Sequence, residues 1–400
     1  MPPAPPPAAS HRSQVPPFTV MTVLAAVAHA RAQGREVISL CAGEPGQGAP
    51  SAVRAAAAQL MHAGIPLGYS ETLGVRALRE GIAGHYARWY GLDIDPQRIC
   101  VTTGSSGAFV LAFLSAFDHG DRVALARPGY PAYKNILTAL GAEVVELDCG
   151  ADVRFQPTVE LLAAAHAQAP LRGLVVASPA NPTGTMISPD ELGALVRWCD
   201  EHGVRVVSDE IYHGVTYTGT VGTCAWEFGR RALVVSSFSK YWGMTGWRLG
   251  WLLLPDDLAG PVDALAGNLA LCAPVPAQHA AVAAFTEAAD TECQVAVEGF
   301  AAARRLVLEA LPALGWTDVA PADGAFYVYA GIANLLGPYA DSVKWCQALL
   351  DQEDVAITPG IDFDGVYGST HVRLSLAPGP DAVAEAIRRI LRFQSRIVSA

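Results

Sequence analysis

The 400-residue sequence contains very little lysine. Only three of its 27 basic residues are lysine, namely Lys134, Lys240 and Lys344, and all the others are arginine. Acidic residues outnumber basic ones, so the net charge is −11 at pH 7, and no run of basic residues occurs. Nucleic acids and anionic lipid surfaces are bound through basic patches. We therefore expect neither nucleic acid nor a membrane surface as a partner.

Paired cysteines, metal-binding motifs and long apolar segments are also missing. The eight cysteines stand singly, without a CxxC pair, which is typical of free thiols in a reducing compartment. The histidines show neither HxxxH nor HExxH spacing, so we expect no metal site. No window of about 18 apolar residues is free of breakers, and the Pro- and Ala-rich residues 1–12 lack the apolar core of a signal peptide. These observations predict a cytoplasmic protein with no membrane span and a disordered arm over residues 1–12.

What the sequence does contain is a regular alternation of short apolar runs and helical patterns. The β-branched runs, which we expect to be strands, are residues 122–126, 142–147, 173–178, 204–208, 232–236 and 248–254. The expected helices are residues 51–62, 74–90, 107–117, 157–168 and 188–202. Apolar strands that alternate with helices form parallel sheets buried on both faces. We therefore predict an α/β fold whose mostly parallel sheet is covered by helices on both faces.

The pattern changes after about residue 262, and a chain of this length exceeds one small core. The expected elements there are an Ala-rich helix to about residue 311, strands at 325–330 and 371–377, and helices at 341–353 and 380–396. This mixture predicts a second, smaller α+β domain. We assign residues 51–289 to the large domain and residues 13–50 and 290–400 to the small domain.

Polar clusters follow three of the strand-like runs. They are NPTG at residues 181–184, DEIY at 209–212 and SFSK at 237–240. Alone, each could be a turn, a helix start or a loop. Because ligands bind outside the carboxyl ends of the strands in open α/β sheets, the three clusters together predict a ligand site.

Further residues in the sequence suit an anion. In TTGSSGAFVLAF, residues 102–113, small residues lead directly into an apolar helix, whose free N–H groups and positive end would attract an anion. Arg248 lies eight residues beyond Lys240 and would be a second anion ligand. Arg373, within HVRLSLA, could be a third basic ligand or a plain surface charge.

Lys240 needs a property that arginine lacks, because this sequence otherwise uses arginine for positive charge. A lysine amine can lose its proton and attack a carbonyl to form a Schiff base, whereas a guanidinium cannot. An acid, a phenol, an amide and an anion site around one lysine together suggest an aldehyde cofactor with a phosphate group. Pyridoxal phosphate has these features.

On these motifs the sequence resembles the class I/II aminotransferases of the fold-type-I pyridoxal-phosphate enzymes. The motifs occur in that family's order between about residues 38 and 377. They are GEPG, Tyr69 with GVRALR behind it, TTGSSGA, RPGYPAY, NPTG, DEIY, SFSK with GWRLGW, and HVRLS.

The resemblance implies roles for the residues around the cofactor ring. Lys240 would form the Schiff base and, once released, move a proton between the substrate α-carbon and the cofactor. Asp209 would pair with the protonated pyridine nitrogen and keep the ring an electron sink. Tyr212 and Asn181 would hydrogen-bond the ring 3′-oxygen, and Tyr130 would stack on the ring face.

The resemblance also implies ligands for the phosphate and the substrate. The expected phosphate ligands are Ser105, Ser106, Ser237 and Arg248. Tyr69 would reach the phosphate of a neighbouring subunit, which implies a homodimer with shared active sites. Arg373 would bind the substrate α-carboxylate through its planar fork, with Gly43 and Asn181 beside it.

The expected reaction is a ping-pong amino transfer from an L-amino acid to a 2-oxo acid. Residues 107–120 and 258–285 contain no lysine or arginine for a second substrate carboxylate, and residues 16–21 (PPFTVM) would add apolar side chains at the pocket entrance. We therefore expect a neutral or aromatic donor, with 2-oxoglutarate or pyruvate as the acceptor. The alternatives are a lyase or cyclase built on the same site, and a non-catalytic amino-acid sensor. The sensor is disfavoured because only about 35 residues precede the first expected core strand.

Overall fold

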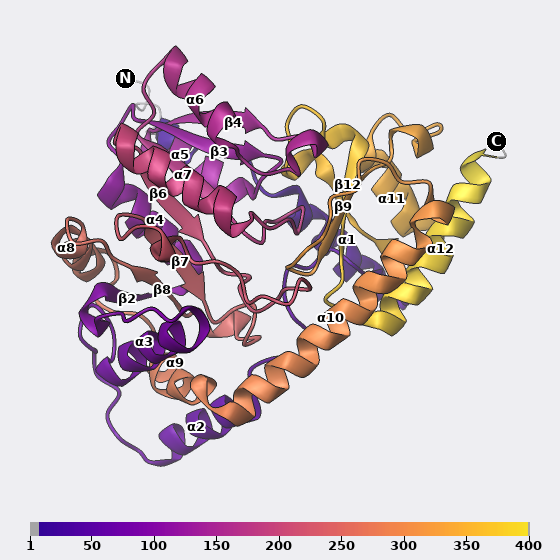
Figure 1. The fold of residues 1–400 in the computed structure, drawn as a ribbon. Coiled ribbons are helices and arrows are strands. Elements are labelled where there is room, and N and C mark those ends of the chain that lie inside the picture. Colours follow the sequence, from indigo (N-terminus) through magenta and orange to yellow (C-terminus); the bar gives the residue numbers. More distant parts are fainter. Residues whose placement is uncertain (1–7, 399–400) are drawn as a thin grey trace, which may run out of the picture.

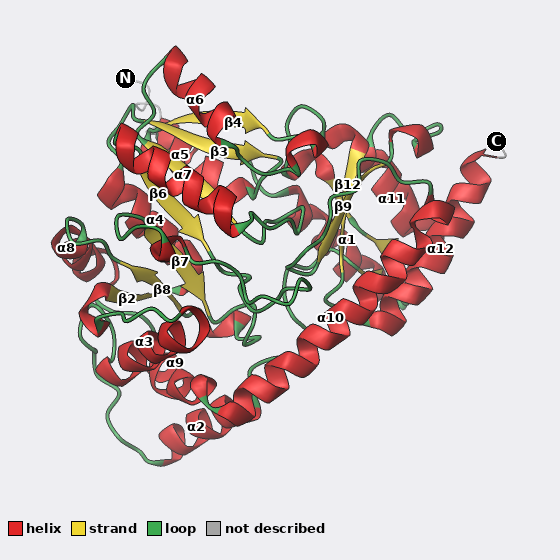
Figure 2. Cartoon of the chain, in the orientation of Figure 1, coloured by secondary structure: helices red, strands yellow, loops and turns green. Residues whose placement is uncertain are grey.

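In the computed structural model, which describes residues 8–398, a seven-stranded sheet forms the middle layer of the larger part of the molecule (Figures 1 and 2). The strand order is β2-β8-β7-β6-β5-β3-β4; β8 is antiparallel to both neighbours and the remaining pairs are parallel. The strands are β2 (Ile99–Thr102), β3 (Arg122–Arg127), β4 (Glu143–Asp148), β5 (Gly173–Ala177), β6 (Arg205–Asp209), β7 (Leu233–Ser237) and β8 (Gly250–Leu253). The predicted mostly parallel sheet is confirmed.

Helices cover this sheet on both faces. One face packs against α4 (Gly104–Ala116), α5 (Pro131–Leu140) and α8 (Ala259–Ala270), and the other against α3 (Arg76–Tyr90), α6 (Val159–Gln168) and α7 (Pro189–His202). Alternate strand residues enter the two cores: Leu233 and Val235 of β7 lie in the first core, and Val234 between them lies in the second. The inner strand β7 is apolar on both sides for this reason, as expected of a doubly covered sheet.

The C-terminal part of the chain forms a smaller α+β unit. It contains the antiparallel sheet β11-β12-β9 and the parallel pair β1-β10. The strands are β1 (Ile38–Ser39), β9 (Tyr327–Gly331), β10 (Val355–Ala356), β11 (Thr358–Pro359) and β12 (His371–Ser375). The helices of this unit are α1 (Thr19–Ala32), α11 (Ser342–Glu353) and α12 (Pro380–Val398). The N-terminal α1 joins it because β1, just after α1, pairs with β10.

A long helix links the two parts of the molecule. The helix α10 (Glu287–Leu314) begins near α2 (Ser51–His62) and α9 (Val275–Ala281) and then runs beside α12 (Figure 1). The prediction of a single Ala-rich helix over residues 262–311 is wrong. It is divided into α8, α9 and α10, because Leu271 has a left-handed φ of 59° and Pro274 directly precedes α9.

The start of β8, the elements α1 and β2, and the N-terminal residues differ from the expectations or lie partly beyond the described residues. The expected strand at 248–254 begins only at Gly250, because Arg248 has a φ of 53° and cannot extend the strand. Neither α1 nor β2 was expected from the sequence. The disordered arm predicted over residues 1–12 falls mostly outside the described residues, and His11–Ser13 form a short 3-10 helix. The domain boundaries at residues 13, 51 and 290 stay a prediction.

The cysteines, the helix lengths and the metal-binding side chains can be compared with the expectations from the sequence. All eight cysteines are free, and burial raises the pKa of several of these thiols, such as Cys41 to about 11. Within residues 8–398, no helix is long and apolar enough to cross a bilayer. In the same residues, no cluster of His, Cys, Asp or Glu side chains is arranged to hold a metal ion.

Candidate active site

The three predicted polar clusters lie at one edge of the large sheet. The strands β5, β6 and β7 are adjacent and parallel, so the loops that follow them leave the sheet on the same side. Asp209 ends β6, Ser237 ends β7, and Asn181 and Lys240 follow within four residues of β5 and β7. The expectation that these clusters meet is confirmed, since the backbone order alone brings them together.

The amine of Lys240 is enclosed by backbone and aromatic rings. Its Nζ donates a hydrogen bond to the carbonyl of Gly43 and lies 5.6 Å from the ring centroid of Tyr212 and 5.9 Å from that of Phe326. Burial and then the positive charge of Arg373 lower the pKa of Lys240 to about 8, against the opposing effect of acidic neighbours. A substantial fraction of this amine is therefore neutral near pH 8, as nucleophilic attack requires.

Asp209 is a buried carboxylate held at both oxygens. Its Oδ1 accepts a hydrogen bond from the N–H of Ile211 at 3.1 Å, and its Oδ2 accepts a short one from the hydroxyl of Tyr133 on α5. Burial raises the pKa of Asp209 to about 6, although the bonds from Tyr133 and Ile211 act in the opposite direction. A cationic partner would lower this pKa again, so the position favours a protonated ring nitrogen.

Two tyrosines from different parts of the fold meet beside the lysine. The hydroxyls of Tyr212 and Tyr327 are hydrogen-bonded at 2.9 Å, and Tyr327 belongs to β9 of the smaller unit. A Cβ atom built on Gly43 would lie 2.6 Å from the Tyr327 hydroxyl. Glycine at position 43 is therefore required by this contact.

Arg373 on β12 is buried at the junction of the two sheets. Its Nη1 donates to Oδ1 of Asn181 at 2.8 Å, and its Nη2 donates to the carbonyl of Cys41 at 2.7 Å. The guanidinium carbon lies 4.4 Å from the ring centroid of Tyr327 and 4.7 Å from that of Phe363. Its Nε is buried and has no hydrogen-bond partner among the described residues. A carboxylate ligand would supply that missing acceptor.

An anion cradle lies where α4 begins. The residue before α4, Thr103, makes no side-chain cap, so the first N–H groups of the helix are free for a ligand. Gly104 has a φ of 67°, and a Cβ atom there would lie 2.5 Å from the guanidinium of Arg248. Ser237 is buried, and its hydroxyl accepts the N–H of Ser239 at 2.9 Å. Donors, a cation and a helix N-terminus thus meet, as a phosphate requires.

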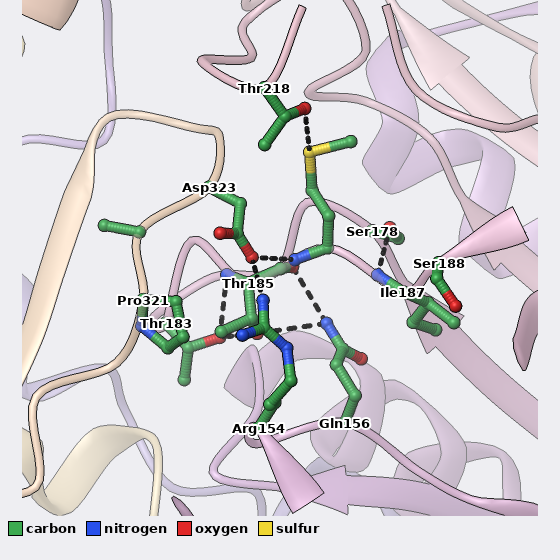
Figure 3. A network of polar contacts seen from close by, with 12 residues as sticks. Arg154, Gln156, Ser178, Thr183, Thr185, Ile187, Ser188, Thr218, Pro321 and Asp323 are labelled. Atoms are coloured by element: carbon green, nitrogen blue, oxygen red, sulfur yellow. Dashed lines mark hydrogen bonds and ion pairs between the residues drawn. The ribbon is translucent and has the colours of Figure 1, made fainter. Parts of the chain in front are cut away.

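Hydrogen bonds from two other loops hold the NPTG loop in place (Figure 3). Gln156 donates to the carbonyl of Thr185 at 2.9 Å and to the carbonyl of Ala177 at 3.2 Å. Asp323, just before β9, accepts from Arg154 at 2.7 Å and from a backbone N–H of the loop at 3.1 Å. The loop is therefore tied both to the large sheet and to the strand that carries Tyr327.

The remaining predicted residues differ in where they lie. Tyr130 is half-buried, 6.2 Å from the ring of Phe18, and makes an edge contact with Tyr133. Ser105 is half-buried in the first turn of α4, whereas Ser106 in the same turn is exposed. Tyr69 is 82% exposed and lies in a separate surface depression of the chain. Gly43, Tyr212, Asp209, Arg248 and Arg373 contact Lys240 or act on its charge, and Asn181 bonds to Arg373.

The chain matches the family Aminotransferase class I and II over residues 35–390. The chain belongs to that family. It is 52% identical over 380 residues to the valine–pyruvate aminotransferase of Mycobacterium tuberculosis, covering 95% of this chain and 96% of the relative. It is 32% identical to the aspartate/prephenate aminotransferase of Thermus thermophilus, over 95% of this chain and 97% of that one.

Solved structures give the same family assignment. The crystal structure of an aminotransferase from Mycobacterium tuberculosis superposes with a TM-score of 0.94 at 50% identity, covering 98% of this chain and all of that one. The Thermus thermophilus aspartate aminotransferase with maleate superposes with a TM-score of 0.89 at 32% identity, over 96% of this chain and 99% of that chain. The chain is therefore a transaminase of fold type I, and enzymes of this family depend on pyridoxal phosphate.

The site fits this cofactor on its own chemistry. The α4 cradle beside Arg248 suits a phosphate, Asp209 suits a ring nitrogen, and the amine of Lys240 has a lowered pKa. The orphaned Nε of Arg373 suits the carboxylate of an amino acid.

Sequence reasoning missed four residues that shape this site: Tyr133, Gln156, Asp323 and Tyr327. Tyr133 had a weak local signal, because it lies three residues after Tyr130 in the RPGYPAY motif. The others reach the site from distant segments, and no spacing in the sequence indicates their partners.

Proposed function

We propose that this transaminase moves the amino group of a neutral, apolar L-amino acid of the valine type to pyruvate by a ping-pong mechanism. The observation that carries the proposal is the polarity of the site. Arg373 offers a buried fork for one carboxylate, while the groups around it are the aromatic rings of Tyr327 and Phe363. Residues 107–120 and 258–285 add no lysine or arginine for a second carboxylate. The 52% identity to a valine–pyruvate aminotransferase supports the same choice.

The chain's own residues have distinct tasks in this proposal. Pyridoxal phosphate, when bound, supplies an aldehyde for the amino group and a ring that accepts electrons from the substrate α-carbon. Lys240 would hold the aldehyde and, as a free amine, would accept the proton of the donor α-carbon. Asp209 keeps the ring nitrogen protonated, with Tyr133 fixing its carboxylate. Tyr212 and Asn181 would hydrogen-bond the ring oxygen, and Tyr130 would cover the ring face.

The anion ligands position the cofactor and the donor. Ser105, Ser106, Ser237, Arg248 and the start of α4 hold the phosphate. Arg373 holds the α-carboxylate of the donor, with the Gly43 backbone beside it. Asn181 is hydrogen-bonded to Arg373, so a shift of either side chain moves the other. The position of the donor therefore depends on the Asn181 amide, which in this proposal also contacts the cofactor ring.

We further propose a homodimer in which Tyr69 of each subunit completes the phosphate site of the other. Tyr69 is 82% exposed, and Ile65, Leu67 and Leu271 are also exposed apolar residues. Subunit contact would bury them. Light scattering on the purified holoenzyme is expected to give twice the chain mass, and a monomer that binds the cofactor tightly would contradict this. The free cysteines support our proposal of a cytoplasmic location.

A donor panel tests the substrate assignment. The kcat/KM of valine, alanine, phenylalanine, aspartate and glutamate is measured with pyruvate and with 2-oxoglutarate as acceptor, and neutral donors with pyruvate are expected to react fastest. Aspartate or glutamate as the best donor by tenfold or more would contradict the proposal. Parallel double-reciprocal lines are expected for ping-pong exchange. Release of ammonia and a 2-oxo acid from a β-substituted donor without acceptor would instead support the lyase alternative.

A further inference from the structure

A short N-terminal segment bridges the two parts of the molecule beside the site. We call residues 14–18 the N-terminal strap. The carbonyl of Pro16 accepts a hydrogen bond from Asn135 on α5 of the large sheet at 3.4 Å, and Phe18 lies 6.2 Å from the ring of Tyr130. Directly after the strap, α1 turns into the smaller unit, where Val27 packs in a core with Leu350. The strap therefore spans from one part to the other next to the proposed ring-stacking tyrosine.

The helix that follows the strap has no local cap. The residue before α1 is Phe18, which offers no side-chain acceptor, and its first turn contains no acidic residue. Asp362 supplies the cap from 343 positions away: its Oδ1 accepts the N–H of Thr19 and its Oδ2 accepts the N–H of Val20, both at 2.8 Å. One carboxylate thus satisfies two free N–H groups and lies at the positive helix end.

The loop that carries Asp362 also contacts the site. Asp362 ends a short 3-10 helix, and the next residue is Phe363. The Phe363 ring lies 4.7 Å from the guanidinium carbon of Arg373, and its carbonyl accepts the N–H of Gly129, which directly precedes Tyr130, at 2.9 Å. A single loop therefore touches the proposed carboxylate-binding arginine, the segment that precedes the proposed ring-stacking tyrosine, and the start of α1 directly after the strap.

We propose that Asp362 is a positioning residue that fixes the N-terminal strap and so holds Phe18 against the side chain of an apolar donor. This inference rests on the proposed function, because it assigns how the apolar side of that same site is held. Phe18 is half-buried, and the residues before it in the strap are exposed. Ordering so exposed a segment requires an anchor, and the two hydrogen bonds from the N–H groups of Thr19 and Val20 to Asp362 fix the residues that directly follow the strap.

Two substitutions at Asp362 and one control separate anchoring from general stability. Asp362→Ala removes both acceptors, and Asp362→Asn keeps one acceptor without the charge. Asp341→Ala is the matched control, because Asp341 caps α11 of the same unit through the N–H of Lys344 at 2.9 Å. The Asp341 control loses a comparable cap without touching the strap.

The first measurement is limited chymotrypsin digestion of each holoenzyme, with cleavage at Phe18 identified by mass spectrometry. We expect Asp362→Ala to be cut there about threefold to tenfold faster than wild type, Asp362→Asn to be intermediate, and the Asp341 control to match wild type. Thermal denaturation checks that the Asp362→Ala variant is folded. If the folded variant is cleaved at Phe18 at the wild-type rate, the anchoring role is overturned. Equal acceleration in the Asp341 control would overturn it as well.

The second measurement is the KM of valine compared with alanine, whose methyl group is too short to need the strap. Asp362→Ala should raise the KM of valine about threefold to tenfold more than that of alanine, with little change in kcat. An equal rise for both donors would overturn the link to specificity. A wild-type preference for aspartate would instead refute the proposed function, and the digestion result would still report on the strap.

Discussion

Gly43→Ala gives the sharpest test of the site's geometry. The Cβ atom of the alanine would lie 2.6 Å from the hydroxyl of Tyr327, whereas ordinary contacts begin at 3.4 Å. Gly43 does not have a left-handed φ, so the backbone itself accepts an alanine. The whole cost of the substitution must therefore come from that one contact.

The structure also indicates the size of the effect. The new Cβ atom and the Tyr327 hydroxyl oxygen must separate by about 0.8 Å. Both sides resist this movement, because the Tyr327 hydroxyl is hydrogen-bonded to Tyr212 and the Gly43 carbonyl is hydrogen-bonded to Lys240. Overpacking of this kind costs about 1–3 kcal/mol. If that cost falls on the transition state, kcat/KM for the amino donor should drop about fivefold to 150-fold. Steady-state kinetics and thermal denaturation of the holoenzyme measure the two effects.

A double-mutant cycle decides whether the clash is the cause. Tyr327→Phe removes the obstructing oxygen and by itself loses one hydrogen bond, worth about 1 kcal/mol. The double variant should lose less transition-state free energy than the sum of the losses of the two single variants. The difference, which is the coupling energy, should be about 1 kcal/mol or more. Strictly additive losses, or a Gly43→Ala variant with wild-type kinetics, would refute the reasoning.

Three further substitutions test separate parts of the site. Tyr133→Phe removes a hydrogen bond to the Asp209 carboxylate and should weaken cofactor binding about tenfold or more in equilibrium dialysis; an affinity within twofold of wild type would argue against it. Arg373→Lys replaces a planar fork by a point charge and should raise the KM of amino-acid donors about tenfold or more, while an amine without a carboxylate serves as the unaffected control. Burial raises the pKa of Glu210 from 4.5 to about 8, so the folded protein keeps a proton that the unfolded chain loses, and stability falls as pH rises through this window. Glu210→Gln should flatten that fall in urea unfolding, and an unchanged slope would contradict the assignment.

Much of the fold was predictable because its strands are buried on both faces. Side chains of β7 enter two cores in alternation, so residues 233–235 had to be apolar and the run was easy to recognise. The adjacency of NPTG, DEIY and SFSK followed from parallel strand order. The breaks at Leu271 and Arg248 were not visible, since a left-handed φ at a non-glycine residue depends on packing around it.

The side chains that hold the reactive groups were much less predictable than the groups themselves. Lys240 stands out because lysine is rare here and its amine has chemistry that arginine lacks. By contrast, the phenol of Tyr327 is hydrogen-bonded to Tyr212, which lies 115 residues away in the sequence. Asp362 caps α1 through Thr19, which lies 343 residues away. Tyrosine and aspartate occur at many ordinary surface and core positions. Only the folded chain shows which of them meets a partner.

The position of Arg373 links substrate binding to the reactivity of Lys240. The charge of Arg373 is, after burial, the largest influence that lowers the pKa of Lys240. A donor carboxylate bound to Arg373 offsets that charge, so the pKa of a free Lys240 amine rises when the donor is in place. A Lys240 amine released from the cofactor by the donor would therefore be a stronger base than burial and the charge of Arg373 alone allow, at the step where the α-proton is removed. In the proposed function, arginine at position 373 would thus act twice, by holding the donor carboxylate and by making the basicity of Lys240 depend on that carboxylate.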